Sequence, residues 1–134
     1  MMRVNTKIRY AVRAMYEIAA CEDKNGVLQK EIVERQKLSP KYLDHIISAL
    51  KAKGLINNRR GKRSGLVLLK KPEDITVYDI SRAFESEVSV VDCVIEPTSC
   101  EKNETCPVYD FWKRLNDQII TTLKSETLRD ILNR

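Results

Sequence analysis

The chain of 134 residues is poor in the residues that several classes of protein need. It contains four glycines, four prolines and a single histidine. So few glycines and prolines argue against a sheet-rich fold with many tight turns. No apolar run approaches the roughly 18 residues of a membrane-spanning helix, and charges interrupt the N-terminal segment where a secretory signal would be continuously apolar. These absences predict a cytoplasmic protein of one compact domain with no membrane partner.

Catalytic groups are also scarce. A serine or cysteine nucleophile normally needs a base to activate it. The only histidine, His45, lies far along the chain from every cysteine, and the sequence has neither a glycine-rich phosphate loop nor an HExxH pair. We therefore expect no enzyme activity, and a thiol redox enzyme is the weakest of the alternatives.

Positive charge is concentrated in one quarter of the chain. Residues 41–71 hold nine basic residues and one acidic residue, a net charge of +8, whereas the remainder carries −3. Such a basic segment on a mildly acidic body is typical of a surface that binds a polyanion. The alternative is a basic face that only contacts solvent. The concentration of charge in one segment argues against this alternative.

The first half of the chain has the pattern of a helix-turn-helix. A helix capped by Thr6 is expected to run to about Cys21, and a short helix is expected within residues 28–36. Ser39 then fits the N-cap of a third helix, Pro40 its first position, and Gly54 the left-handed residue that ends it. Two such helices joined by a few residues predict a helix-turn-helix motif.

The pattern changes after this motif. Two short extended runs around a turn with Gly61 and Gly65 predict a basic β-hairpin, which would form a wing. Thr76 and Asp79 are spaced as a capping box for a further helix. A long helix follows Pro107, with apolar residues at alternating steps of four and three.

The apolar face of the long helix has two interpretations: it packs on its own domain, or it forms a dimer interface. We favour the dimer interface, because the rest of so small a chain cannot cover this apolar surface. The predicted fold class is mainly α: a winged helix-turn-helix with a small β-hairpin wing and a long C-terminal dimerisation helix. Residues 1–74 would bind DNA, and residues 75–134 would carry the sensor loop and the dimerisation helix.

The third helix and the wing supply the candidate DNA contacts. In a helix-turn-helix the N-terminal residues of the second helix lie nearest the base edges. Here those residues are Ser39, Pro40, Lys41, Tyr42, Asp44 and His45. The wing adds Arg59, Arg60, Lys62 and Arg63, which suit phosphates or the minor groove. Asp44 has two interpretations: it accepts a hydrogen bond from a cytosine amino group, or it points away from the DNA.

Three of the four cysteines cluster in the second half, as Cys93, Cys100 and Cys106. Their C-x6-C-x5-C spacing is neither that of common zinc sites nor the C-x-x-C of thiol oxidoreductases. The residues between them are mostly polar, which argues against three buried structural cysteines. Core packing remains reasonable for Cys93, which follows an apolar run, and for Cys21. Spacing alone leaves metal binding, redox chemistry and core packing open.

Several stretches taken together resemble one known family. "YAVRAMYEIA", "LSPKYLDHIISALKAKGLI", "KKPEDITVYDISRAFE" and three cysteines ahead of a long helix are similar to the Rrf-two family of bacterial winged-helix regulators. The resemblance implies a homodimeric transcription factor that binds an imperfect palindrome in double-stranded DNA, with Arg60 entering the minor groove. It also implies an iron–sulfur cluster, [2Fe-2S] or [4Fe-4S], held by Cys93, Cys100 and Cys106.

The resemblance leaves the fourth cluster ligand open. Relatives use a histidine or an acid at positions that hold Tyr109 and Arg9 here, and a guanidinium cannot ligate iron. Asp110, Glu104, a small thiol or water could take the place. The family also implies an alternative function, a cluster-free repressor that responds to thiol oxidation or to a partner enzyme of cysteine metabolism.

Overall fold

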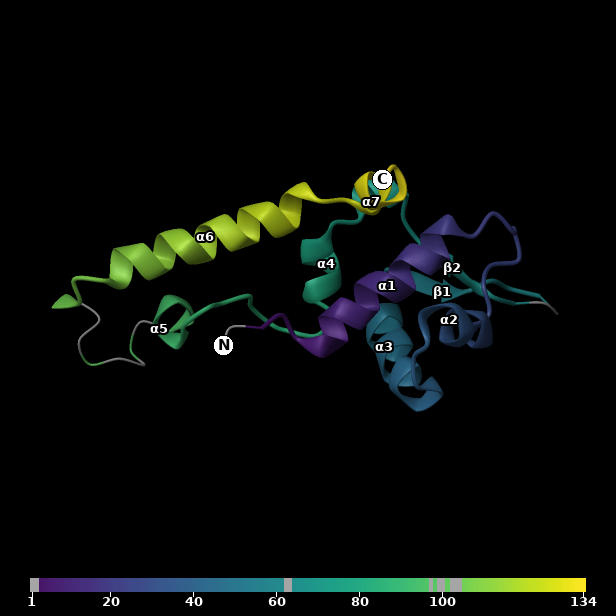
Figure 1. Ribbon diagram of the computed structural model, residues 1–134, viewed down its shortest axis with the longest axis horizontal. Coiled ribbons are helices and arrows are strands. Elements are labelled where there is room, and N and C mark those ends of the chain that lie inside the picture. The colour runs from purple at the N-terminus through teal and green to yellow at the C-terminus, as the bar shows by residue number, and fades with distance from the viewer. Residues whose placement is uncertain (1–2, 62–63, 97, 99–100, 102–104) are drawn as a thin grey trace.

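In the described part of the chain, helices surround one small antiparallel hairpin, and the long helix α6 (Tyr109–Ser125) extends away from them (Figure 1). A computed structural model describes residues 3–61, 64–96, 98, 101 and 105–134. In this part of the chain the elements are α1 (Thr6–Ala20), α2 (Gln29–Gln36), α3 (Pro40–Ala52), β1 (Ile56–Asn58), β2 (Leu66–Leu68), the 3₁₀ turn η1 (Pro72–Asp74), α4 (Val77–Ser81), α5 (Asp92–Ile95), α6 (Tyr109–Ser125) and α7 (Leu128–Leu132). The predicted fold class, mainly α with a winged helix-turn-helix, is confirmed.

Helix α1 lies at the centre of the fold. It contacts α2, α3, α4, α7 and β2. Its cap is Asn5 rather than the expected Thr6, because the Asn5 side chain accepts a hydrogen bond from the Lys7 N–H at 2.8 Å. An asparagine just before the helix satisfies an N–H that has no partner within the helix, so Thr6 becomes the first helical residue.

Helix α3 begins and ends where the sequence predicts. The Ser39 hydroxyl accepts from the Tyr42 N–H at 3.4 Å, and Pro40 takes the first helical position. Gly54, with φ +80°, follows the last turn in the left-handed conformation. Leu43 and Leu50 are completely buried against α1 and α2. Caps therefore fix the two ends of α3, and apolar burial fixes its orientation.

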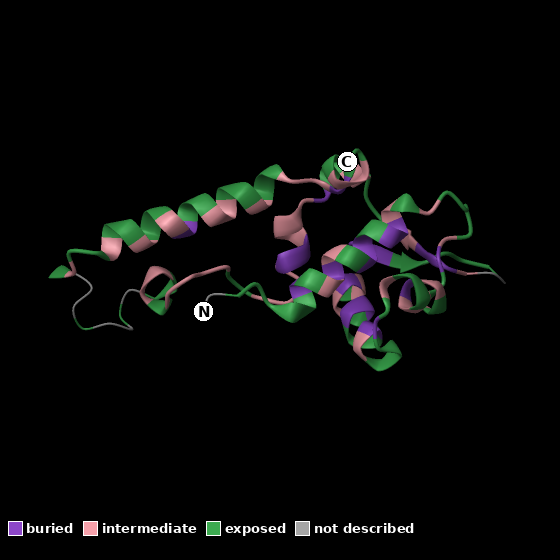
Figure 2. Cartoon of the chain, viewed as in Figure 1, coloured by how far each residue is buried: buried purple, intermediate pink, exposed green. Residues whose placement is uncertain are grey.

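The core lies among α1, α2, α3 and the hairpin, and it also includes buried residues of α4 and α7 (Figure 2). Full burial of each Ile, Leu or Met side chain contributes about 1.5–3 kcal/mol relative to exposure. The largest completely buried side chains include Met15, Ile32, Leu43, Ile46, Leu50, Leu55, Ile56, Leu66, Ile75, Ile80 and Leu128. Because this set runs from α1 to α7, the core includes side chains from both halves of the chain.

The wing is attached to the segment between α1 and α2. Strands β1 and β2 pair antiparallel, with Ile56 opposite Leu68, and Val27 adds an isolated bridge to Leu66. Gly26 and Gly65 lie backbone against backbone beside this bridge. The Gly65 N–H also donates to the Asn25 carbonyl at 2.7 Å. The start of β2 is therefore fixed to the body of the protein.

The C-terminal part leaves the body and returns to it. Helix α6 extends away from the α1–α3 bundle, with α5 beside its far end (Figure 1). After α6 the chain turns into α7, a separate helix that the sequence pattern did not distinguish. Leu128 is only 1% exposed, and its N–H donates to the Ile75 carbonyl at 2.9 Å. None of the helices in the described ranges has the length and apolar content that a membrane span needs.

Candidate DNA interface and cysteine segment

The first turn of α3 presents a polar surface to solvent. Ser39, Pro40, Lys41, Asp44 and His45 are exposed, and Tyr42 is half-buried. A hollow of about 290 Å³ lies among Ser39, Lys41, Tyr42 and His45. The structure thus brings together, on one helix end, the α3 residues that the sequence singles out. This surface offers hydroxyl, ammonium, imidazole and carboxylate groups, each able to hydrogen-bond a base edge or a phosphate.

The ring of Tyr42 packs against Tyr10 at the edge of a hollow. It meets the Tyr10 ring edge-on, with centroids 5.5 Å apart and planes at 88°. The Arg13 guanidinium lies 5.2 Å from the centroid of Tyr10. A second hollow, of about 590 Å³, joins the start of α1 to the turn before α3 and is lined in part by Tyr10 and Tyr42. Aromatic packing therefore holds Tyr42 in place at the edge of the candidate interface.

The turn of the helix-turn-helix contains an unusual backbone conformation. Lys37 has φ +53°, in the left-handed region that costs a residue with a side chain about 1–2 kcal/mol. The Lys37 N–H donates to the Val33 carbonyl. The Leu38 N–H donates to the same carbonyl at 3.2 Å. These bonds end α2 just before the turn that leads into α3. Lys37 itself is exposed beside the hollow of Tyr10 and Tyr42.

A polar network ties α2 to α1. Glu17, 8% exposed, accepts from the Gln36 amide at 2.6 Å and pairs with Arg35 at 3.4 Å. Arg13 donates from Nε to the Gln36 side chain at 2.8 Å, and its guanidinium also bonds the Gln36 carbonyl. A nearly buried carboxylate is stable only while its partners remain, so this network fixes α2 on α1. The first helix of the motif is thereby held in place.

The described wing residues differ in what their side chains contact. Arg59 and Arg60 are both exposed at the end of β1. The Arg59 guanidinium donates to the carbonyl of Lys24, in the α1–α2 connection. The predicted contacts Lys62 and Arg63 lie outside the described residues. Arg59 therefore helps to hold the wing against the body as well as adding charge to it.

Asp44 has a partner that the sequence did not indicate. Its Oδ1 accepts a hydrogen bond from the Gln29 amide at 2.7 Å. Gln29 is the first residue of α2 and is half-buried. The only sequence signal was an amide at the start of the preceding helix, which does not reveal a contact fifteen residues away. Asp44 therefore reaches across to α2 instead of extending freely into solvent.

The cysteine segment leads directly into α6. Cys93 lies in α5 and is half-buried, as is Cys106 just before α6, and both are free thiols. Cys100 lies outside the described residues. Among the residues that are described, no group of three or more His, Cys, Asp or Glu side chains is placed to hold a metal ion. By chemistry, three thiolates are soft donors that fit iron–sulfur clusters.

Cys21 differs from the other thiols. It caps the end of α1, packs against the core while only half-buried, and its Sγ lies 3.8 Å from the Asp23 carbonyl. This position agrees with the expectation of a structural cysteine.

One hydrogen bond joins the approach to the cysteines to α6. The Val90 N–H donates to the Asn116 side chain at 3.0 Å. Among the residues of α6, all of which are described, only Asn116 is buried, at 4% exposure. The sequence did not predict the burial of Asn116, because an amide beside an apolar stripe is typical of a surface residue. Its burial makes it a fixed point between the segment before Cys93 and the long helix.

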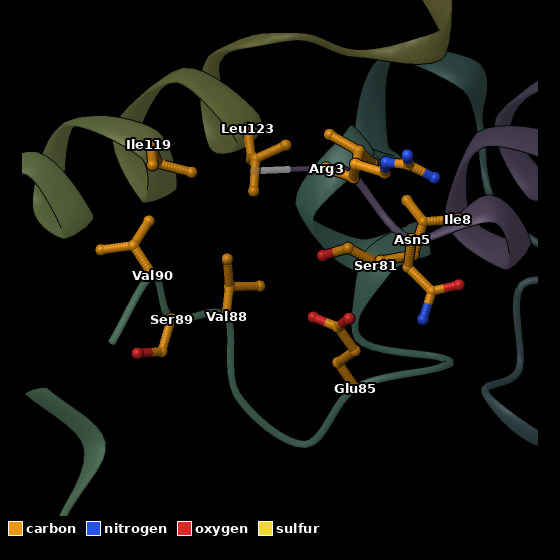
Figure 3. A pocket seen from close by; sticks show the side chains of 11 residues that line it. Arg3, Asn5, Ile8, Ser81, Glu85, Val88, Ser89, Val90, Ile119 and Leu123 are labelled. Atoms are coloured by element: carbon orange, nitrogen blue, oxygen red, sulfur yellow. The ribbon is translucent and has the colours of Figure 1, made fainter. Parts of the chain in front are cut away.

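A mostly apolar hollow separates part of α6 from the body. It measures about 270 Å³ and is lined by Val88 and Val90 on one side and by Ile119 and Leu123 of α6 on the other. Figure 3 shows these four side chains facing one another, with Glu85 from the segment after α4 at one side. The apolar stripe of α6 is thus only partly covered by its own chain.

Comparisons with known proteins agree with this architecture. The Rrf2 family, described as iron-dependent transcriptional regulator, matches residues 4–134. The HTH-type transcriptional regulator IscR of Photorhabdus laumondii is 32% identical over 98% of this chain and 80% of its own length. IscR of Escherichia coli K12 is 31% identical over 98% of this chain and 81% of its own.

Solved structures give the same result. CymR, the global cysteine regulator of B. subtilis, superposes with a TM-score of 0.81 at 31% identity, covering 99% of this chain and 98% of its own. IscR of T. potens has a TM-score of 0.77 at 32% identity, covering 98% of this chain and 87% of its own. Relatives named as transcriptional regulators also point away from an enzyme. With its winged helix-turn-helix, its basic wing and these matches, the chain belongs to the Rrf2 family of DNA-binding transcriptional regulators.

Proposed function

We propose that the protein is a homodimeric regulator that binds an imperfect palindrome and senses iron–sulfur status, or oxidative or nitrosative stress. The sensor would be a cluster, [2Fe-2S] or [4Fe-4S], held by Cys93, Cys100 and Cys106. The observation that supports the proposal is the placement of Cys93 in α5 and of Cys106 just before α6. The segment that bears them is bonded to α6 through Val90 and Asn116 and leads straight into that helix.

DNA would be held by the first turn of α3 and by the wing. The exposed groups of α3 would face base edges in the major groove, and Arg60 would enter the minor groove. Exposed basic side chains of the wing would bind phosphates, which dominate affinity and make it fall steeply with salt. The proposed contacts are Ser39, Pro40, Lys41, Tyr42, Asp44, His45, Arg59, Arg60, Lys62 and Arg63.

The dimer would form through α6. Val108, the N-cap of α6, and Phe111, in its first turn, are each 51% exposed. The hollow along Ile119 and Leu123 leaves further apolar surface open. Twofold symmetry would set two recognition helices against two half-sites of the palindrome. Residues 1–74 would then act as the DNA-binding region and residues 75–134 as the sensing and dimerisation region.

Sensing would be a coupling between two sites. An iron–sulfur cluster, when bound, supplies one-electron redox chemistry whose potential depends on its ligands and exposure. The thiols would hold the segment before α6 in one arrangement, and Asn116 would pass that arrangement to the helix through the Val90 backbone. A coupling free energy of about 1–3 kcal/mol would change operator affinity roughly 5- to 150-fold.

Anaerobic reconstitution with iron and sulfide tests the cluster. Wild-type protein is expected to gain visible absorption bands, because three thiolates can hold the iron. Cys100→Ala should lose these bands, whereas Cys21→Ala should keep them, since Cys21 caps the end of α1 and is not in the cysteine segment. A colourless wild type that still binds DNA, or bands that survive in Cys100→Ala, would contradict the cluster assignment.

A second candidate function is a cluster-free repressor that responds to thiol oxidation or to a partner of cysteine metabolism. It is favoured by the similarity to the global cysteine regulator of B. subtilis, at a TM-score of 0.81. The half-buried free thiols Cys93 and Cys106 would then be the sensing groups. A DNA affinity that changes with peroxide but not with iron and sulfide would support this candidate.

Arg60→Ala is expected to weaken operator binding by about 1–3 kcal/mol, roughly 5- to 150-fold, if Arg60 enters the minor groove. Losing one cationic contact should also make the salt dependence shallower by about one ion. Fluorescence anisotropy at several salt concentrations would measure both. Arg114→Ala, which removes the same charge from an exposed position of α6, is the matched control. Equal affinities for the two variants would remove Arg60 from the site.

A further inference from the structure

The contact between Gln29 and Asp44 joins the two helices of the DNA-binding motif. The donor lies at the first position of α2, and the acceptor lies one turn into α3. Their atoms are 2.7 Å apart, a normal length for a hydrogen bond to a carboxylate. Asp44 is exposed, so the bond is not forced by burial of the acid.

Asp44 is the single acid within the basic segment of residues 41–71. A free carboxylate at a surface that binds a polyanion would be repelled by phosphate and would turn toward solvent. The Gln29 amide holds one carboxylate oxygen and so restricts the side chain to one orientation. The second oxygen, Oδ2, keeps its lone pairs for a donor that approaches from outside.

The donors that a base edge offers in the major groove are amino groups. Cytosine presents N4–H and adenine presents N6–H, whereas guanine presents acceptors there. A fixed acceptor would therefore favour a base with an amino group at one position of each half-site. A mobile carboxylate would discriminate less, because ordering it on binding costs side-chain entropy.

We propose that Gln29 is a positioning residue for sequence specificity: it orients Asp44 so that the second carboxylate oxygen reads an amino-bearing base. This inference rests on the proposed function, since it requires that α3 faces DNA. Gln29 acts through Asp44 and not through phosphate contacts. Its loss should therefore change which sequence is chosen more than how tightly DNA in general is held.

Selection from a library of randomised palindromic duplexes tests this directly with the full-length protein. Wild type is expected to enrich a defined base at the position read by Asp44. Gln29→Leu, which keeps the volume but removes the donor, should relax that preference roughly 5- to 10-fold, the lower end of the discrimination that one base contact provides. Asp44→Asn should relax the same position, and the double variant should be no worse than either single one. Glu34→Gln, on the exposed side of α2, should select as wild type does.

Each outcome of the selection either supports or overturns the positioning role of Gln29. Relaxation at one shared position, with unchanged melting temperature and unchanged affinity for unrelated DNA, supports the positioning role. A Gln29→Leu protein that selects the wild-type sequence overturns it while leaving DNA binding intact. A change at a position that Asp44→Asn does not affect also overturns it, because Gln29 would then read DNA by itself. A wild type that selects no sequence overturns both this inference and the proposed function.

Discussion

Replacing Gly65 with alanine is expected to lower the free energy of unfolding by about 2–4 kcal/mol. A Cβ at this position would lie 2.7 Å from both the Gly26 carbonyl oxygen and the Val27 nitrogen, and it would also meet the Gly26 carbonyl carbon. All three are backbone atoms, so no side chain can rotate away to make room. The start of β2 would have to separate from the α1–α2 connection.

The hydrogen bonds that would break explain the size of this effect. Leu66 and Val27 exchange two backbone bonds, of 2.7 and 3.1 Å, next to the contact of the glycines. Separating the start of β2 from the α1–α2 connection by even an ångström would weaken both bonds and disturb Leu66, which is 1% exposed. Because the wing depends on this attachment, operator affinity should fall together with stability.

Urea denaturation, followed by circular dichroism, would measure the loss, and Gly54→Ala is the matched control. Gly54 has φ +80°, but a Cβ added there would meet nothing within 4 Å, so alanine costs only the left-handed backbone conformation, about 1–2 kcal/mol. Gly65→Ala should therefore be the more destabilising of the two. Equal losses, or a larger loss at Gly54, would contradict the close approach of the two backbones.

Leu115→Asp is expected to convert the proposed dimer into monomers and to reduce operator affinity on the order of 10³-fold. The size follows from the gap between specific and non-specific binding, which is at least about this large. Phe111, Leu115 and Ile119 recur at four-residue steps on α6 and so lie on one face. Phe111 is 51% exposed and Leu115 and Ile119 are half-buried, so this face is only partly covered by its own chain.

A carboxylate in the middle of that face would be desolvated by a partner helix without a compensating charge. Sedimentation equilibrium would give the assembly state, and anisotropy with a palindromic duplex would give the affinity. Thr121→Asp places the same charge at an exposed position of the same helix and should leave both unchanged. A Leu115→Asp protein that remains dimeric with full affinity would exclude this face of α6 as the interface.

Local signals in the sequence predicted much of the fold. Ser39, Pro40 and Gly54 were assigned correctly as cap, first residue and terminator of α3, because each acts within a few residues of itself. Thr76 and Asp79 form the predicted capping box, with bonds of 3.0 and 3.1 Å. The prediction that Thr6 is the N-cap of α1 was wrong. Asn5 is the cap, because adjacent polar residues compete for the same N–H groups.

Contacts between distant segments could not be predicted in this way. The sequence predicts that Gly65 is a turn residue. In the structure its lack of a side chain allows its backbone to contact that of Gly26, thirty-nine positions earlier. The bonds of Gln29 to Asp44 and of Val90 to Asn116 likewise depend on how helices come together. The candidate DNA surface was predictable because its residues share one helix and one hairpin, whereas the groups that position them come from elsewhere in the chain.

The return of the chain through α7 gives α6 a mechanical asymmetry. Its C-terminal end is anchored by Leu128 in the core, while its N-terminal end is joined to the segment that bears the cysteines. Seventeen residues make a rod of about 25 Å at 1.5 Å per residue. A shift of about 2 Å at the N-terminal end would therefore tilt the rod by about 5°, and would change the angle between the two rods of the proposed dimer by about twice as much. In the proposed dimer on a palindrome, where half-sites lie about 34 Å apart, such a tilt would change the spacing of the two recognition helices.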